Sequence, residues 1–213
     1  MFELRDGRGN DNTHKNTIIK IDGKGRFVEF AQAFGIGKVK LAFRQYDDKQ
    51  SAGNRLTNQI DCYLNISEAA ELADAILSNR IKELAIKGEK ARIAGNYKVA
   101  QPCYENYSGT IREGNPVARR VYITMKGTND PNYEKIPFSI TAEEGPGVQT
   151  NTGAFSPAAN YKEQKKYVVI GLTYDKLLAI ATELKRAVAI YDTWNALGIL
   201  EKNLNALSAR PAN

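Results

Sequence analysis

One pattern of residues occurs twice along this chain, in "CYLNISEAAELADAIL" (62–77) and in "VVIGLTYDKLLAIATEL" (168–184). Each copy runs from a short apolar strand through a small hydroxyl residue into an amphipathic helix. Ser67 and Thr173 stand where a helix N-cap is expected, because their side-chain oxygens can accept an unpaired backbone N–H of the first turn. Apolar residues then recur every three or four positions, which predicts a helix with one apolar side.

Alternating apolar and polar residues precede each of these helices. Such alternation predicts strands, because successive side chains of a strand point to opposite faces of its sheet. The expected strands are 17–22, 26–34, 38–46 and 59–66 in the first half, and 117–126, 135–144 and 165–173 in the second, with a further strand within 90–100. The segment 145–164 is rich in Gly, Asn and Pro, and we expect a long functional or mobile loop there.

These elements predict an α+β fold built from two β-β-β-β-α repeats. One such unit covers only one face of its sheet, so we expect the two to form a pseudo-twofold domain with antiparallel sheets and helices packed on one face. A chain of 213 residues is long enough for that core. The expected parts are a flexible N-terminal arm at 1–16, the repeats at 17–90 and 91–195, and a C-terminal helix and tail at 196–213.

The composition limits the kinds of function. There are 30 Lys and Arg against 24 Asp and Glu, a net charge of +6, which permits a polyanionic partner. Two cysteines and one histidine provide neither a disulfide framework nor a zinc ligand set, so we expect no metal, no cofactor and a reduced, cytoplasmic setting. The sequence contains no run of about 18 apolar residues, so we expect no membrane span.

Two of the expected strands carry apolar side chains on one face and cationic or aromatic side chains on the other. Lys and Arg neutralise phosphates, and a phenol ring offers a base a surface on which to stack. Duplex bases are already stacked and hidden, so this combination favours single strands. The candidate nucleic-acid-binding residues are Lys38, Lys40, Arg44 and Tyr46 in the first half, Arg120, Tyr122 and Lys126 in the second, and Arg26 and Arg55 in neighbouring turns.

Other interpretations of these faces stay open. An antiparallel sheet with one solvated face normally carries polar residues there, and Lys and Tyr are common choices. A structural or self-assembly protein, using its sheet faces and its C-terminal helix, is the main alternative to a single-stranded DNA-binding protein. RNA binding would use the same chemistry. Trp194 fits either an oligomer contact or an anchor at the end of a helix.

No motif in the sequence predicts an enzyme. "GKGR" (23–26) and "GIGK" (35–38) lack the spacing of a phosphate-binding loop and predict hairpin turns. His14 has no Ser or Cys in a recognisable nucleophile motif. The acidic pairs at 47–48 and 143–144 are expected in turns, whereas two-metal chemistry needs several carboxylates that converge on one point.

The stretches "LNISEAAEL", "IGLTYDKLL" and "GKVKLAF" together resemble the Whirly family, over about residues 17–195. More loosely, they resemble the PUR-repeat proteins and the transcriptional-coactivator single-strand binders of the same β-β-β-β-α unit. The last stretch runs Gly-Lys-Val-Lys where the Whirly motif runs Gly-Lys-Ala-Ala. The resemblance implies single-stranded DNA binding across sheet edges and a homo-oligomer, with Lys38 and Lys40 as the corresponding binding positions.

Overall fold

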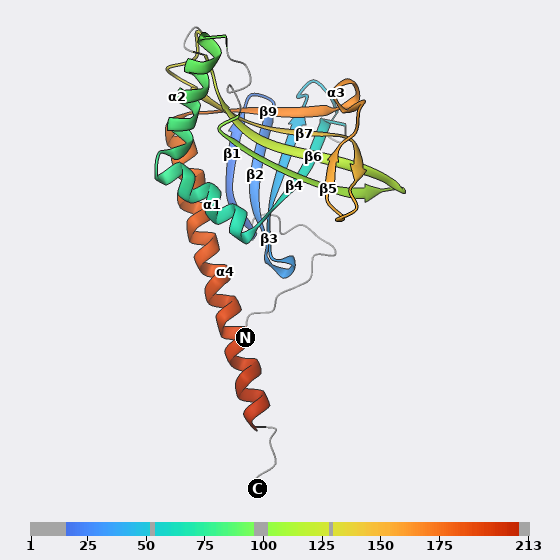
Figure 1. Cartoon of the computed structure of the whole chain (residues 1–213), viewed down its shortest axis with the longest axis vertical. Helices are drawn as coiled ribbons and strands as arrows, with labels where there is room; N and C mark the ends of the chain where they lie inside the picture. Colours follow the sequence, from blue (N-terminus) through green and yellow to red (C-terminus); the bar gives the residue numbers. More distant parts are fainter. Residues whose placement is uncertain (1–15, 52–53, 96–101, 128–129, 209–213) are drawn as a thin grey trace.

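The computed structural model describes residues 16–51, 54–95, 102–127 and 130–208. It contains two antiparallel sheets, with helices packed beside them, and confirms the predicted α+β class. Figure 1 shows the sheets on one side of a long C-terminal helix. The expected arm at 1–16 falls almost wholly outside the described residues.

The first sheet contains four strands in sequence order. Its hairpin turns are those that the glycine motifs predicted: Gly25 and Gly37 both have φ of +64°, a left-handed conformation that suits glycine. A single turn of 3-10 helix, η2 (Phe34–Ile36), completes the second of these connections. The strands are β1 (Thr17–Gly23), β2 (Arg26–Ala33), β3 (Lys38–Tyr46) and β4 (Leu56–Asn65).

The second sheet repeats this order with one insertion. Its main path is β5 (Tyr104–Arg112), β6 (Asn115–Met125), β7 (Phe138–Gln149) and β9 (Lys166–Leu172), while β8 (Phe155–Pro157) pairs with the far end of β7. The strand expected within 90–100 is not found in the described part of that range. Residues 90–93 end a helix, residues 96–101 lie outside the described part of the chain, and the first strand of this sheet begins only at Tyr104.

The first half ends in two helices, α1 (Ile66–Leu77) and α2 (Arg80–Ile93), and the second half ends in α4 (Tyr174–Ser208). The short helix α3 (Tyr161–Gln164) lies between β8 and β9. The sequence pattern did not predict α2, although Ile81, Ala85 and Gly88 bury one side of it at helical spacing. Helix α4 continues without a break to Ser208, so the expected C-terminal helix is the end of this same helix.

One of the two predicted N-caps is confirmed. The Thr173 hydroxyl accepts a hydrogen bond from the backbone N–H of Lys176 at 3.1 Å, at the start of α4. The other is wrong: Asn65 caps α1 in a capping box, and its backbone N–H donates to the Glu68 carboxylate at 2.7 Å. Ser67 therefore lies inside the first turn, since the Asn–Glu pair satisfies the helix start two residues earlier.

The core forms where the apolar faces of the two sheets and the helices meet. Val39, Leu41 and Phe43 on β3 are fully buried, as the alternation in their strand predicted. Strand β9 contacts all four strands of the first sheet, and Figure 1 shows it running across them. The helices α1 and α4 pack against each other beside this interface. The apolar face of the first sheet is thus covered by the second sheet as well as by helices.

The expected long loop at 145–164 is largely ordered. Strand β7 extends to Gln149, and β8 and α3 fold back onto the second sheet. This cover depends on glycine at position 109, because a Cβ there would lie 2.3 Å from the Phe155 side chain and 2.6 Å from the Val117 carbonyl oxygen.

We expect Gly109→Ala to lower the free energy of unfolding by about 1–3 kcal/mol, because both neighbours of the added methyl group would have to move. Urea unfolding followed by circular dichroism would measure the change. Gly35→Ala is the matched control, since a Cβ at Gly35 would have no neighbour within 4 Å. Equal effects of the two substitutions would contradict this account of the close packing at Gly109.

Candidate nucleic-acid interface

On the first sheet, two predicted cations share one carboxylate. Asp61 on β4 lies opposite Ala42 on β3, between the positions of Lys40 and Arg44. The carboxylate lies 2.9 Å from the Lys40 ammonium and 2.6 Å from the Arg44 guanidinium. Burial tends to raise the pKa of Asp61, but the hydrogen bonds from Arg44 and Lys40 outweigh it and hold the pKa below its ordinary value.

This face of the first sheet is close to neutral as a whole. By strand register, Lys20, Asp22, Glu29 and Lys38 lie on the same side as Lys40, Arg44 and Asp61. That makes four cations against three carboxylates, and Lys20 pairs with Asp22 at 3.0 Å. The sheet face by itself therefore lacks the strongly positive surface that the alternation suggested.

A more positive group of charges lies on the second sheet. Glu144 on β7 has a side chain only 4% exposed and stands directly between Arg119 on β6 and Lys166 on β9. Its oxygens lie 2.7 Å from Arg119, 3.0 Å from Lys166, and 2.9 and 3.0 Å from the two terminal nitrogens of Arg112. Burial opposes ionisation, but these three partners prevail and lower the pKa of Glu144 to about 2.

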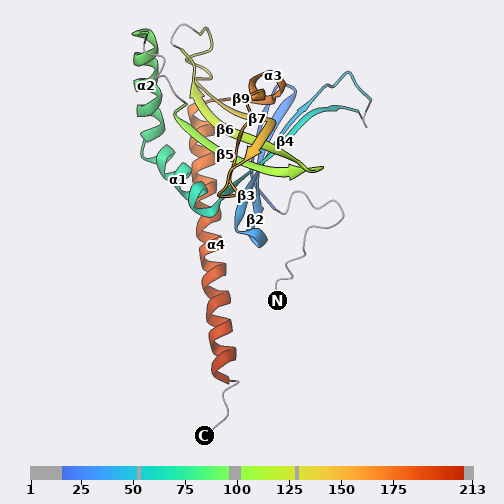
Figure 2. The same ribbon diagram turned by 45° about the vertical axis from the view of Figure 1, so that its right-hand side comes forward.

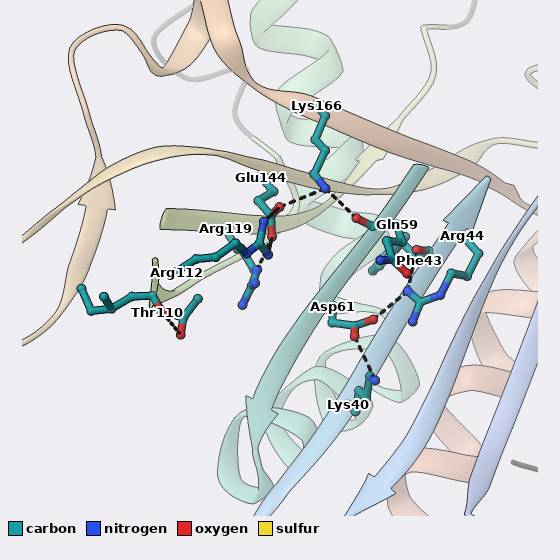
Figure 3. A network of polar contacts seen from close by, with 11 residues as sticks. Lys40, Phe43, Arg44, Gln59, Asp61, Thr110, Arg112, Arg119, Glu144 and Lys166 are labelled. Carbon is teal, nitrogen blue, oxygen red and sulfur yellow. Dashed lines mark hydrogen bonds and ion pairs between the residues drawn. The ribbon is translucent and has the colours of Figure 1, made fainter. Parts of the chain in front are cut away.

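The two groups approach each other where the sheets meet, at Gln59, which is the register partner of Arg44. The Lys166 ammonium also donates to the Gln59 carbonyl oxygen on β4 at 2.9 Å, and the Asn58 side-chain amide donates to the Tyr167 carbonyl oxygen at 3.0 Å. Figure 3 shows both groups of contacts and Gln59 between them. We call these residues the junction cluster: Lys40, Arg44, Asp61, Arg112, Arg119, Glu144 and Lys166. Its five cations and two carboxylates leave an excess of three positive charges.

The members of the junction cluster differ in exposure. Arg119 is 10% and Arg44 is 18% exposed, so both are held mainly by their carboxylate partners. Arg112 is 49%, Lys166 42% and Lys40 31% exposed. The ion pairs Arg119–Glu144 and Arg44–Asp61 hold the cluster in place. The other three cations reach solvent, where they can contact a further anion.

Aromatic side chains lie on the opposite face of the second sheet. Strand register aligns Tyr107, Arg120, Glu143 and Tyr167 across β5, β6, β7 and β9, and we call these four the tyrosine row. Tyr107 is 49% and Tyr167 is 58% exposed. Three strand spacings separate the two, roughly 14 Å in all.

Charge is balanced around the tyrosine row. Arg120 pairs with Glu105 and lies 3.9 Å from Glu143, which also pairs with Lys165. The Arg120 guanidinium lies 4.4 Å from the ring centre of Tyr122, whose hydroxyl donates to Glu143 at 3.0 Å. This face offers exposed rings rather than a net positive charge, so it suits stacking and not phosphate attraction.

The predicted site residues are thus distributed over several surfaces. Lys40 and Arg44 belong to the junction cluster, and Arg120 and Tyr122 to the tyrosine row or its edge. The remaining residues have other neighbours: Arg26 donates to the Val169 carbonyl oxygen, Tyr46 lies beside Phe27, Arg55 donates to the Gln50 carbonyl oxygen, Lys126 faces Asp130 at 3.8 Å, and Lys38 is half-buried at the start of β3. Their binding roles stay predictions.

Sequence reasoning missed Arg112, Arg119, Glu144 and Lys166. One signal was present: Arg119 alternates with Val121 and so belongs to the apolar face of its strand, where a cation needs a carboxylate partner. The prediction of a turn at Glu143–Glu144 is also wrong. Both residues lie within β7 and are buried, because cations on β6 and β9 stabilise their charges inside the sheet.

Comparison with known proteins gives little further information. No protein-family profile and no curated protein sequence matches the chain. Among solved structures, the Whirly protein WHY1 from Arabidopsis thaliana is similar over 92% of this chain and 95% of its own, with a TM-score of 0.42 and 10% sequence identity. A likeness at that level shows neither a shared family nor a shared function.

The described residues lack two kinds of feature. They contain no group of three or more His, Cys, Asp and Glu side chains that could hold a metal ion. They also contain no helix long and apolar enough to cross a membrane. Cys62 and Cys103 are both buried free thiols, and burial raises the pKa of each to about 12.

We expect Glu144→Gln to destabilise the fold by on the order of 3 kcal/mol at pH 7, because it leaves Arg119 without its carboxylate partner. The pKa of Glu144 is lowered on folding from 4.5 to about 2. The stability it contributes is therefore complete above about pH 4.5 and is lost as the pH falls toward 2. Urea unfolding between pH 7 and pH 3 should show the native protein and the variant converging in acid.

Glu134→Gln is the matched control, because Glu134 is an exposed carboxylate outside both sheets. It should change the unfolding midpoint little at any pH. A difference between Glu144→Gln and the native protein that stays constant with pH would show that the ionised carboxylate is not the source of the stability.

Proposed function

We propose that this protein binds single-stranded nucleic acid, with DNA as the first candidate, and that it does so without catalysing a reaction. The junction cluster carries the proposal: five cations share two carboxylates at the boundary of two sheets, and three of the cations reach solvent. An excess of positive charge with exposed donor groups suits the phosphates of a nucleic-acid backbone.

The outer cations are the phosphate contacts in this proposal. Arg112 can hold a phosphate oxygen with the part of its guanidinium that is left free, while Lys40 and Lys166 act as mobile point charges. Arg44 and Arg119 are tied to their carboxylates and position the others. Because Glu144 and Asp61 stay ionised, the site keeps its shape when a phosphate arrives.

The bases would reach the tyrosine row around the edge of β9. Lys166 and Tyr167 are neighbours on β9, which is an edge strand, and their side chains point to opposite faces. A single strand that crosses this edge can place phosphates at Lys166 and bases at Tyr167. A duplex presents no free base to a ring, which favours a single-stranded ligand.

The first test is fluorescence anisotropy with labelled single-stranded DNA, duplex DNA and single-stranded RNA at several salt concentrations. We expect the native protein to prefer single strands and to lose affinity steeply as salt rises. Arg112→Gln with Lys166→Gln should weaken binding and reduce the slope of log affinity against log salt by about 1.4, or roughly 0.7 for each lost phosphate contact.

Lys185→Gln with Arg186→Gln is the matched control, because it removes the same charge from two exposed residues of α4. It should leave the affinity nearly unchanged. If the two double variants weaken binding equally, the junction cluster is not the site. If the native protein binds none of the three ligands, nucleic-acid binding itself is wrong.

A second test addresses stacking at the tyrosine row. We expect Tyr167→Leu to weaken single-strand binding by about 1–3 kcal/mol without changing the salt slope, because a stacked ring is lost and no phosphate contact is. Tyr167→Phe keeps the ring and should bind like the native protein. Equal affinities of the Leu and Phe variants would exclude stacking at this position.

A further inference from the structure

The last part of α4 carries a row of exposed apolar side chains. Between 44% and 60% of each side chain is open to solvent, which is unusual for five large apolar residues on one short segment. We call this row the terminal stripe: Ile190, Trp194, Leu197, Leu200 and Leu204. Their spacing of three or four residues places them along one side of the helix.

The terminal stripe lies where α4 leaves the rest of the protein. The Tyr191 ring still packs against Phe34 of the first sheet's connection, with 5.3 Å between the ring centres. Beyond this point Figures 1 and 2 both show α4 projecting away from the sheets and the other helices. The stripe therefore has no described neighbour within the chain that covers it.

The terminal stripe does not continue the face by which α4 packs on the core. Earlier in the helix, Leu177, Ile180 and Leu184 are buried against the sheets and α1. At about 100° per residue, the mean direction of the stripe is roughly 140° around the helix axis from that buried face. A separate apolar face on a projecting helix indicates a second packing partner.

We propose that this partner is the same segment of a second copy of the chain, and that the two copies associate along their terminal stripes. Ile190, Leu197, Leu200 and Leu204 occupy core positions of a short coiled-coil seam. Residues 189–205 contain only three charged side chains, and of these only Glu201 flanks the seam. Two copies can therefore meet without a row of like charges.

The size of the stripe fits self-association. Each of its side chains exposes on the order of 100 Å², so two copies would bury roughly 1,000 Å² of apolar surface in total, the size at which specific interfaces begin. A membrane-surface helix would carry many Lys and Arg on its polar side, whereas Lys202 is the one cation in residues 189–205. This proposal is independent of nucleic-acid binding.

The test is sedimentation velocity of the full chain without nucleic acid, in about 0.5 M salt, where apolar contacts persist and surface ion pairs are screened. We expect the native protein to shift from oligomer to monomer on dilution, and Leu197→Asp with Leu204→Asp to be monomeric throughout. Circular dichroism would establish that the variant keeps its helix content.

Ile199→Asp is the matched control, because Ile199 is 54% exposed on the opposite side of the same helix. It should associate like the native protein. Trp194 is the chain's one tryptophan, so its emission should move to longer wavelength when the stripe separates. A native protein that is monomeric at every concentration, or an Ile199→Asp variant that dissociates as readily as the double variant, would overturn the proposal.

Discussion

The packing of β9 across the apolar face of the first sheet is the contact on which the other features depend. One helix is too narrow to cover the whole apolar face of a four-stranded sheet, so the second sheet has to complete the core. Val168, Ile170 and Leu172 of β9 are buried in this interface beside Val39, Leu41 and Phe43 of β3. The same crossing brings the edge strands β4 and β9 together and so creates the polar boundary that we propose as the binding site.

That boundary shows how stability and binding can share one set of charges. Glu144 is buried at the end of the sheet interface, and its ionised form is stable only because Arg112, Arg119 and Lys166 surround it. Three cations are more than one carboxylate needs. The excess charge therefore remains available to a phosphate, while the carboxylate keeps the cations in place.

The two proposed surfaces are opposite in chemistry and lie on separate parts of the molecule. The junction cluster is charged and belongs to the rigid sheets, whereas the terminal stripe is apolar and belongs to a projecting helix. Added salt weakens phosphate contacts and leaves apolar contacts intact. Self-association through α4 would give each assembly several junction clusters, and a long single strand could then contact more than one of them.

The sequence by itself determined the local elements. The alternation of apolar and polar residues predicted seven of the strands and the buried side of β3. Glycines predicted the two hairpin turns, and Thr173 predicted the start of α4. Each of these features depends on residues that are neighbours in the sequence. Tertiary structure decided the rest. Asp61 meets Lys40 and Arg44 only through strand register, and Glu144 meets Arg112 across 32 residues. Such partners depend on how strands and sheets align. The predicted site residues therefore included only Lys40 and Arg44 of the junction cluster, and Glu144 was expected in a turn.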